Sequence, residues 1–104
     1  MSKYGAKRTF SELCGRTFAS KLEAHRAEEL KLMEMAGEIS DLRYQVVFKL
    51  SNSPKITISI DFAYKLRHGE RIYEDTKGVL TRDFRTKLAW LRENFGLDVI
   101  LTRS

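Results

Sequence analysis

The sequence of 104 residues has little cysteine or proline and no long apolar segment. Its single cysteine, Cys14, excludes an intrachain disulfide and fits a reducing compartment. No apolar run approaches the length of a membrane span, and the first five residues lack the apolar stretch of a signal peptide. These absences predict a cytoplasmic protein with no membrane partner.

Charge, by contrast, is abundant. Charged residues make up 32% of the chain, and 19 Lys and Arg against 14 Asp and Glu give a formal net charge of +5. This surplus suits a polyanionic partner such as nucleic acid, although a merely soluble basic protein has the same composition. Residues 1–16 are expected to form a basic arm whose Lys7 and Arg8 contact DNA, with a solvated tail as the alternative.

Hydrophobic periodicity divides residues 17–104 into the elements of one domain. The expected elements are a helix over 17–36, strands over 43–50, 55–64 and 71–77, a helix between Thr81 and Gly96, and a strand over 97–101. The last strand is mostly apolar, as expected of a strand paired parallel to an earlier one across a helical crossover. The order α-β-β-β-α-β predicts an α/β fold with a mixed sheet and helices packed on it.

One acid of the first helix is predicted to point inward. The neighbours of Glu23 on the helical surface are Ala19, Ala27 and Leu30. A carboxylate beside such a stripe faces the body of the protein, which costs desolvation energy unless a cation or a donor meets it. The main apolar face of this helix is expected to contain Phe18, Leu22, Met33 and Ala36, with Ala19 and Leu30 beside them.

The hairpin that joins the second and third strands predicts a pair of opposed acids. If it turns near His68-Gly69, the numbers of paired residues add to about 136 in an antiparallel register. Asp61 then lies across from Asp75, with Cβ atoms roughly 5 Å apart. Lys77 shares that face because side chains alternate along a strand.

Two directly opposed carboxylates destabilise a sheet, and a divalent cation resolves the conflict. Mg²⁺, with Mn²⁺ as a substitute, prefers such oxygens and also takes phosphate oxygens and water. Lys77 can then orient or deprotonate a bound water, or neutralise charge in the transition state. The predicted metal ligands are Asp61, Asp75, Glu23 and Thr76. The competing explanation is that an Asp followed by Asp-x-Lys occurs by chance in a chain this rich in charge.

The pattern Asp61 … Asp75-x-Lys77, with a helical Glu23 upstream and the order α-β-β-β-α-β, resembles the PD-(D/E)xK nuclease superfamily. More closely, the chain resembles small phage- and prophage-encoded proteins assigned to that superfamily. The segments that carry the closer resemblance include Tyr4 to Lys7, Phe18 to Glu23, Ile39 to Gln45, Ile60 to Phe62, Glu74 to Gly78 and Thr81 to Lys87. Ile60 stands where the superfamily name has proline. Glu74 faces away from Asp75 along the strand, so Asp75 is the preferred ligand.

The resemblance implies a restriction-endonuclease-like core and Mg²⁺-dependent hydrolysis of DNA phosphodiester bonds. It implies Asp61 and Asp75 as metal ligands, with Glu23 as an additional acid. It also implies Lys77 as the catalytic lysine, and Gln45 matches a strand glutamine often placed near such sites. Relatives within the superfamily include Holliday junction resolvases and phage nicking enzymes, so we expect a structure-selective endonuclease of phage replication or recombination in the host cytoplasm.

Further residues are predicted to contact DNA. Arg85 and Lys87 begin the second helix close to the end of the Lys77 strand, although a solvated basic face explains them equally well. Gln45 belongs to the same predicted set. A homodimer is expected because junction resolution needs two sites. The alternatives left open are a non-catalytic DNA-binding module of the same fold, an RNase, and a nicking or packaging-associated nuclease.

Overall fold

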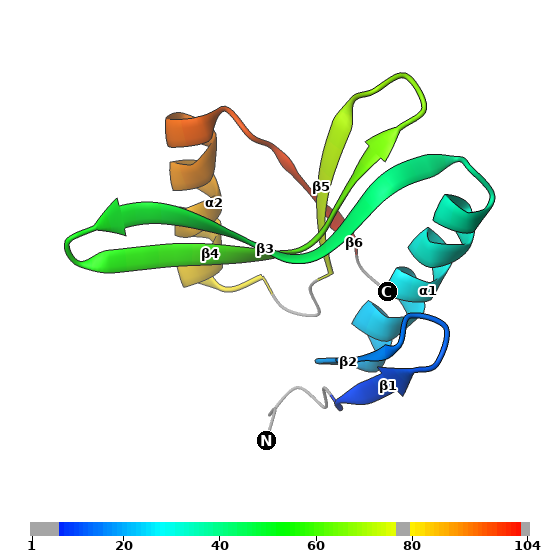
Figure 1. The fold of residues 1–104 in the computed structure, drawn as a ribbon. Helices are drawn as coiled ribbons and strands as arrows, with labels where there is room; N and C mark the ends of the chain where they lie inside the picture. Colours follow the sequence, from blue (N-terminus) through cyan, green and yellow to red (C-terminus); the bar gives the residue numbers. More distant parts are fainter. Residues whose placement is uncertain (1–6, 77–79, 103–104) are drawn as a thin grey trace.

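The computed structural model describes residues 7–76 and 80–102 and has a mixed α/β architecture, as the sequence predicts (Figure 1). Its elements are β1 (Thr9–Ser11), β2 (Arg16–Phe18), α1 (Lys21–Met35), β3 (Ile39–Asn52), β4 (Lys55–Leu66), β5 (Arg71–Thr76), α2 (Arg82–Phe95) and β6 (Val99–Thr102). A four-stranded sheet has the order β3-β4-β5-β6, and β1 and β2 form a separate hairpin. The pairing of β5 with β6 is parallel and the other pairings are antiparallel, so the predicted mixed sheet is confirmed.

The strands β3 and β4 form a long hairpin, of which only the inner part joins the rest of the sheet. β4 pairs with β5 over residues 62–65, whereas its pairing with β3 continues to Asn52 and Lys55. We call the outer part, residues 46–60, the arm, which is distinct from the basic arm predicted at residues 1–16. Figure 1 shows it extending beside α2. One face of the arm is closed by α2, because Ile58, Ile60 and Leu91 are buried together there.

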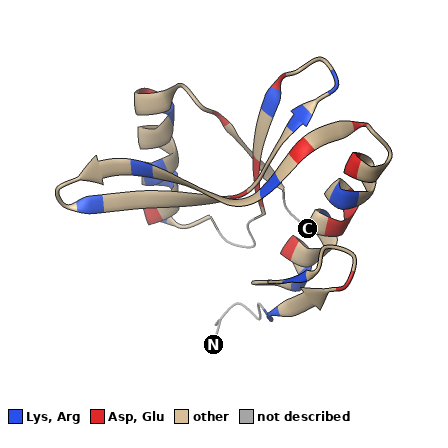
Figure 2. Ribbon diagram, viewed as in Figure 1, with Lys and Arg blue, Asp and Glu red and all other residues tan. Residues whose placement is uncertain are grey.

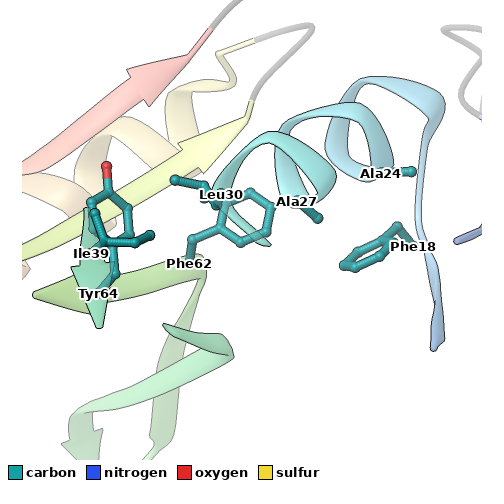
Figure 3. Packing of buried hydrophobic residues seen from close by; sticks show 7 residues of the cluster. All are labelled: Phe18, Ala24, Ala27, Leu30, Ile39, Phe62 and Tyr64. Atoms are coloured by element: carbon teal, nitrogen blue, oxygen red, sulfur yellow. The ribbon is translucent and has the colours of Figure 1, made fainter. Parts of the chain in front are cut away.

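A second core lies between α1 and the inner part of the sheet. The buried residues of α1 include Ala24, Ala27 and Leu30, which pack with Phe62 and Tyr64 of β4 (Figure 3). The expected apolar face of this helix was therefore correct in part, since Leu30, expected beside it, is fully buried and Met33 packs against the core. Of the residues expected there, Ala36 is exposed, Leu22 and Met33 are half-buried, and Phe18 is buried but belongs to β2.

The segment before α1 differs most from its prediction. Residues 9–16 were expected in a basic arm, yet most of them lie in the β1–β2 hairpin, and Ser11 is buried with its hydroxyl donating to Glu28 at 2.6 Å. α1 consequently begins at Lys21, four residues later than predicted. The Ser20 hydroxyl accepts a hydrogen bond from the backbone N–H of Glu23 at 3.1 Å, which caps the helix.

The predicted ends of α2 are confirmed. The Thr81 hydroxyl accepts from the backbone N–H of Phe84 at 3.1 Å, and Gly96 ends the helix with a φ of 67°, a conformation that favours glycine. Within the described ranges, no helix is long and apolar enough to cross a membrane.

Candidate active site

The register of β4 and β5 brings Asp61 beside Asp75. The paired residues run from Lys65 with Arg71 to Phe62 with Glu74. The residue numbers of each pair add to 136, which is the register predicted from the sequence. One step further along both strands lie Asp61 and Asp75. The backbone N–H of Asp61 donates to Oδ1 of Asp75 at 2.8 Å, so the acids predicted to be opposed are neighbours.

The two aspartates hold the strand ends together reciprocally. Oδ2 of Asp61 accepts from both the backbone N–H and the hydroxyl of Thr76, each at 2.9 Å, while Asp75 accepts from β4. Each carboxylate therefore takes an N–H group of the other strand. Asp75 is completely buried and Asp61 is half-buried, and each carboxylate is held in place by a backbone N–H group. The Thr76 hydroxyl, predicted as a metal ligand, donates to Asp61 in this arrangement.

Gln45 of β3 joins Glu23 of α1 to this pair. Its Nε2 lies 3.0 Å from Oε2 of Glu23 and 3.2 Å from Oδ1 of Asp61, and it donates to both. Its Oε1 accepts from the hydroxyl of Ser59 at 2.8 Å. The amide thus lies between two acids and is itself oriented by a third side chain, so the residue predicted to contact DNA is engaged by the acids.

The backbone of Gln45 is unusual for a strand. Its φ is 51°, in the left-handed region that glycine tolerates and other residues adopt at a cost. Residues on both sides keep their pairs, Tyr44 with Phe62 and Val46 with Ile60. The sheet therefore accommodates a strained residue at the point where its side chain bridges Glu23 and Asp61.

Burial and the two aspartates raise the cost of ionising Glu23. Glu23 is only 5% exposed, and burial is the largest cause that raises its pKa from 4.5 to about 7. The nearby charge of Asp61 raises it further and that of Asp75 adds a smaller amount, while hydrogen bonds from the Ala19 backbone and Gln45 oppose the shift. Glu23 is therefore an acid that changes its protonation state near neutral pH, and its predicted inward direction is confirmed.

The carboxylates of this group suit Mg²⁺, which keeps several water ligands, better than a metal ion whose ligands all come from the protein. In the described parts of the chain, no three His, Cys, Asp or Glu side chains come together as a ready-made metal site. Asp61 and Asp75, however, are neighbours across β4 and β5, and Mg²⁺ usually takes one or two carboxylates with water and substrate phosphates. A cation there would also offset the charges of Asp61 and Asp75, which add to the effect of burial on the pKa of Glu23.

The other predicted residues lie on α2, before β1 or outside the described residues. Lys77, the predicted catalytic lysine, falls outside them. Lys87 lies on α2 with its Nζ 3.5 Å from Asp83, and Arg85 is exposed on the same helix. Lys7 and Arg8 are exposed before β1. Their predicted contacts with DNA stay predictions.

A family model described as "Protein of unknown function (DUF1064)" matches residues 1–102. The chain belongs to this family. No curated protein and no solved structure matches the chain.

Sequence reasoning missed two features around the acids. Ser59, which orients Gln45, lies two residues before Asp61 and so on the same face of β4, a signal that the alternation contained. Glu74 was correctly expected to face away from Asp75, but its partner was not foreseen. It is paired with Arg26 of α1, which lies 48 residues earlier in the chain.

Proposed function

We propose that the protein is a metal-dependent endonuclease that hydrolyses DNA phosphodiester bonds at Asp61, Asp75 and Glu23. The observation that carries the proposal is the reciprocal fixing of Asp61 and Asp75, with Glu23 held beside them at a pKa of about 7. Opposed like charges destabilise a sheet, so a function is a good reason for keeping them. Strongly shifted pKa values are also typical of functional sites.

Asp61 and Asp75 are the residues that would hold Mg²⁺, because their carboxylates are adjacent and already positioned by backbone N–H groups. The ion, when bound, supplies polarisation of a phosphate and a lower pKa for water. Glu23 exchanges a proton near neutral pH and is the candidate acid or base. Gln45 keeps Glu23 and Asp61 at a fixed separation. Lys77 keeps its predicted role of orienting water or neutralising charge.

The charge of the arm supports a nucleic-acid substrate. The arm contains Lys49 and Lys55 and no acid, although 32% of the chain is charged, and Arg43 lies just before it. In Figure 2 the outer arm carries blue segments and no red one. Lys49 is exposed on the strand face that also carries Gln45, so a polyanion that reaches the acids is attracted along the arm.

The finer expectation is a structure-selective enzyme that cuts branched DNA as a homodimer in the cytoplasm of a phage-infected host. A domain of this size offers little surface for a duplex, and two sites related by symmetry match the two strands cut at a junction. The test is a cleavage panel in Mg²⁺ and in Mn²⁺. It uses plasmid, linear duplex, flap, four-way junction, single-stranded DNA and RNA, with a junction-against-duplex competition.

The decisive variants are Asp75→Asn and Asp75→Ala. We expect both to lower cleavage by more than about 100-fold while DNA binding is kept, because Asp75 acts on the reacting phosphate and not on DNA docking. The matched control is Asp98→Ala, which removes an exposed aspartate that pairs with Arg92 at 2.7 Å. DNA binding without cleavage of any substrate by the unaltered protein would overturn the proposal in favour of a binding module. Cleavage of RNA alone would assign an RNase.

A further inference from the structure

A second buried carboxylate lies directly behind the candidate active site. Glu74 is 1% exposed and accepts hydrogen bonds from three elements. Arg26 of α1 donates through Nε at 2.5 Å and Nη2 at 3.0 Å. The Tyr64 hydroxyl of β4 donates at 2.8 Å and the Thr102 hydroxyl of β6 at 2.7 Å. We call Glu74, Arg26, Tyr64 and Thr102 the Glu74 network. None of its members belongs to the proposed chemistry.

The network shares both of its main elements with the candidate site. Glu74 immediately precedes Asp75 on β5, and Arg26 follows Glu23 by three residues, less than one turn of α1. One peptide unit and one helical turn are short, stiff connections. The position of the Arg26–Glu74 pair therefore fixes how far Glu23 stands from Asp75.

Apolar packing alone restrains the rotation of α1 about its own axis only weakly. Its buried apolar residues are Ala24, Ala27 and Leu30, and two of these three are alanines. Small side chains let the helix come close to the sheet, but they interlock little with it. Gln45 holds only the carboxylate of Glu23, at 3.0 Å. A bidentate guanidinium–carboxylate pair, in contrast, fixes both distance and orientation.

We propose that the Glu74 network is a positioning device, which sets α1 on β5 so that Glu23 meets Asp61 and Asp75. This inference rests on the proposed function for its consequence in catalysis. Buried ion pairs seldom stabilise a fold more than apolar residues of the same volume. Stability alone therefore gives little reason for an ion pair here, whereas a fixed geometry does.

The test separates stability from geometry by comparing Arg26→Met with the double variant Arg26→Met/Glu74→Leu. Arg26→Met leaves a lone buried charge that lowers the melting temperature, and an apolar pair in the double variant can raise it again. We expect the double variant to recover most of that temperature. Its kcat should nevertheless stay about 10- to 100-fold low at a temperature where it is folded, with KM for DNA changed less than about threefold. The Kd for Mn²⁺, measured by calorimetry, should rise.

A signal independent of activity is the side-chain amide of Gln45 in a ¹H–¹⁵N spectrum. It donates to Glu23 and Asp61, so a displaced α1 should move its resonances. The matched control is Arg92→Met, which breaks the exposed Arg92–Asp98 pair and should move neither kcat nor the amide. Tyr64→Phe and Thr102→Val each remove one donor and give milder variants if the double variant does not fold.

Recovery of kcat together with melting temperature would overturn the positioning role, and so would an unmoved Gln45 amide in a folded double variant. If the unaltered protein neither cuts nucleic acid nor binds Mn²⁺, the proposed function fails. A moved amide in the double variant would then still support the positioning of α1 by the Glu74 network.

Discussion

Glu74 and Asp75 are consecutive residues of β5 and both are buried, yet their carboxylates face opposite surroundings. Burial by itself would raise the pKa of Glu74, but hydrogen bonds from Arg26, Thr102 and Tyr64 outweigh it and leave that pKa below its ordinary value. On the Asp75 side the nearest helical acid, Glu23, has its pKa raised to about 7 by burial and by the other carboxylates.

The difference separates an acid whose charge the fold stabilises from the acids that we propose to be functional. The Glu74 network supplies a guanidinium and two hydroxyls, so the charge of Glu74 is stabilised within the fold. The group of Glu23, Asp61 and Asp75 instead concentrates like charges where a cation would be favourable. If this comparison is correct, removing charge should harm the first side and help the second.

The largest effect should come from Arg26→Met. The substitution leaves Glu74 buried without its guanidinium, which typically costs about 3–5 kcal/mol of unfolding free energy. Asp61→Asn on the other side should change it by less than about 1 kcal/mol, because the amide oxygen can still accept from Thr76 and the loss of one crowded charge offsets the lost contact with Gln45. Urea unfolding at pH 7.5 without divalent ions measures both. A small cost at Arg26 or a large one at Asp61 would reverse the comparison.

An intermediate effect concerns pH. The folded-state pKa of Glu23 lies above its ordinary value, so its protonated form contributes stability that is complete below about pH 4.5 and is lost as pH rises to about 7. The loss amounts to about 3 kcal/mol at most. Glu23→Gln keeps an acceptor for Gln45 and should therefore be more stable than the unaltered protein at pH 8 and equal to it near pH 4.

Unfolding curves at pH 4, 6 and 8 in the absence of divalent ions measure this difference. Glu38→Gln, a change at an exposed glutamate, is the matched control and should leave the pH dependence unaltered. Parallel pH profiles for Glu23→Gln and the unaltered protein would show that the acids do not crowd one another. Added Mg²⁺ should narrow the difference if the ion binds between them.

The features predicted correctly from the sequence depend on short-range rules. In the loop between β4 and β5 the Leu66 N–H donates to the Glu70 carbonyl and the Gly69 N–H donates to the Leu66 carbonyl. The turn therefore lies where it was predicted, and the alternation of the strands determined which acids meet. The inward direction of Glu23 followed from its helical neighbours. Thr81 and Gly96 marked the ends of α2 by their capping chemistry.

The features that were missed depend on tertiary contacts or on strands too short to show a pattern. β1 and β2 have three residues each, too few for alternation to be recognised. β3 starts at Ile39, whereas its predicted start was residue 43. The earlier start was missed because Asp41, with a φ of 53°, lies at an irregularity that interrupts the alternation. The pairing of Arg26 with Glu74 joins residues 48 apart, and no local rule links them.

The smallest effect should separate backbone strain from side-chain contact at Gln45. Gln45→Ala and Gln45→Gly both remove the amide that bridges Glu23 and Asp61, so the difference between them reports the backbone. Glycine adopts a φ of 51° freely, whereas alanine does not. We expect the glycine variant to be more stable than the alanine variant by about 1 kcal/mol, measured by urea unfolding.

An ordinary strand position should show the opposite order, since glycine weakens a strand through its greater loss of entropy. Val47 provides the control, because it lies two residues further along β3 on the same face and is 61% exposed. Alanine should be the more stable replacement there. The same order at both positions would mean that Gln45 stores no strain. Opposite orders would mean that Gln45 has a strained backbone. The strain would then lie beside Glu23, Asp61 and Asp75, where the Gln45 side chain is held in place, and not beside Glu74.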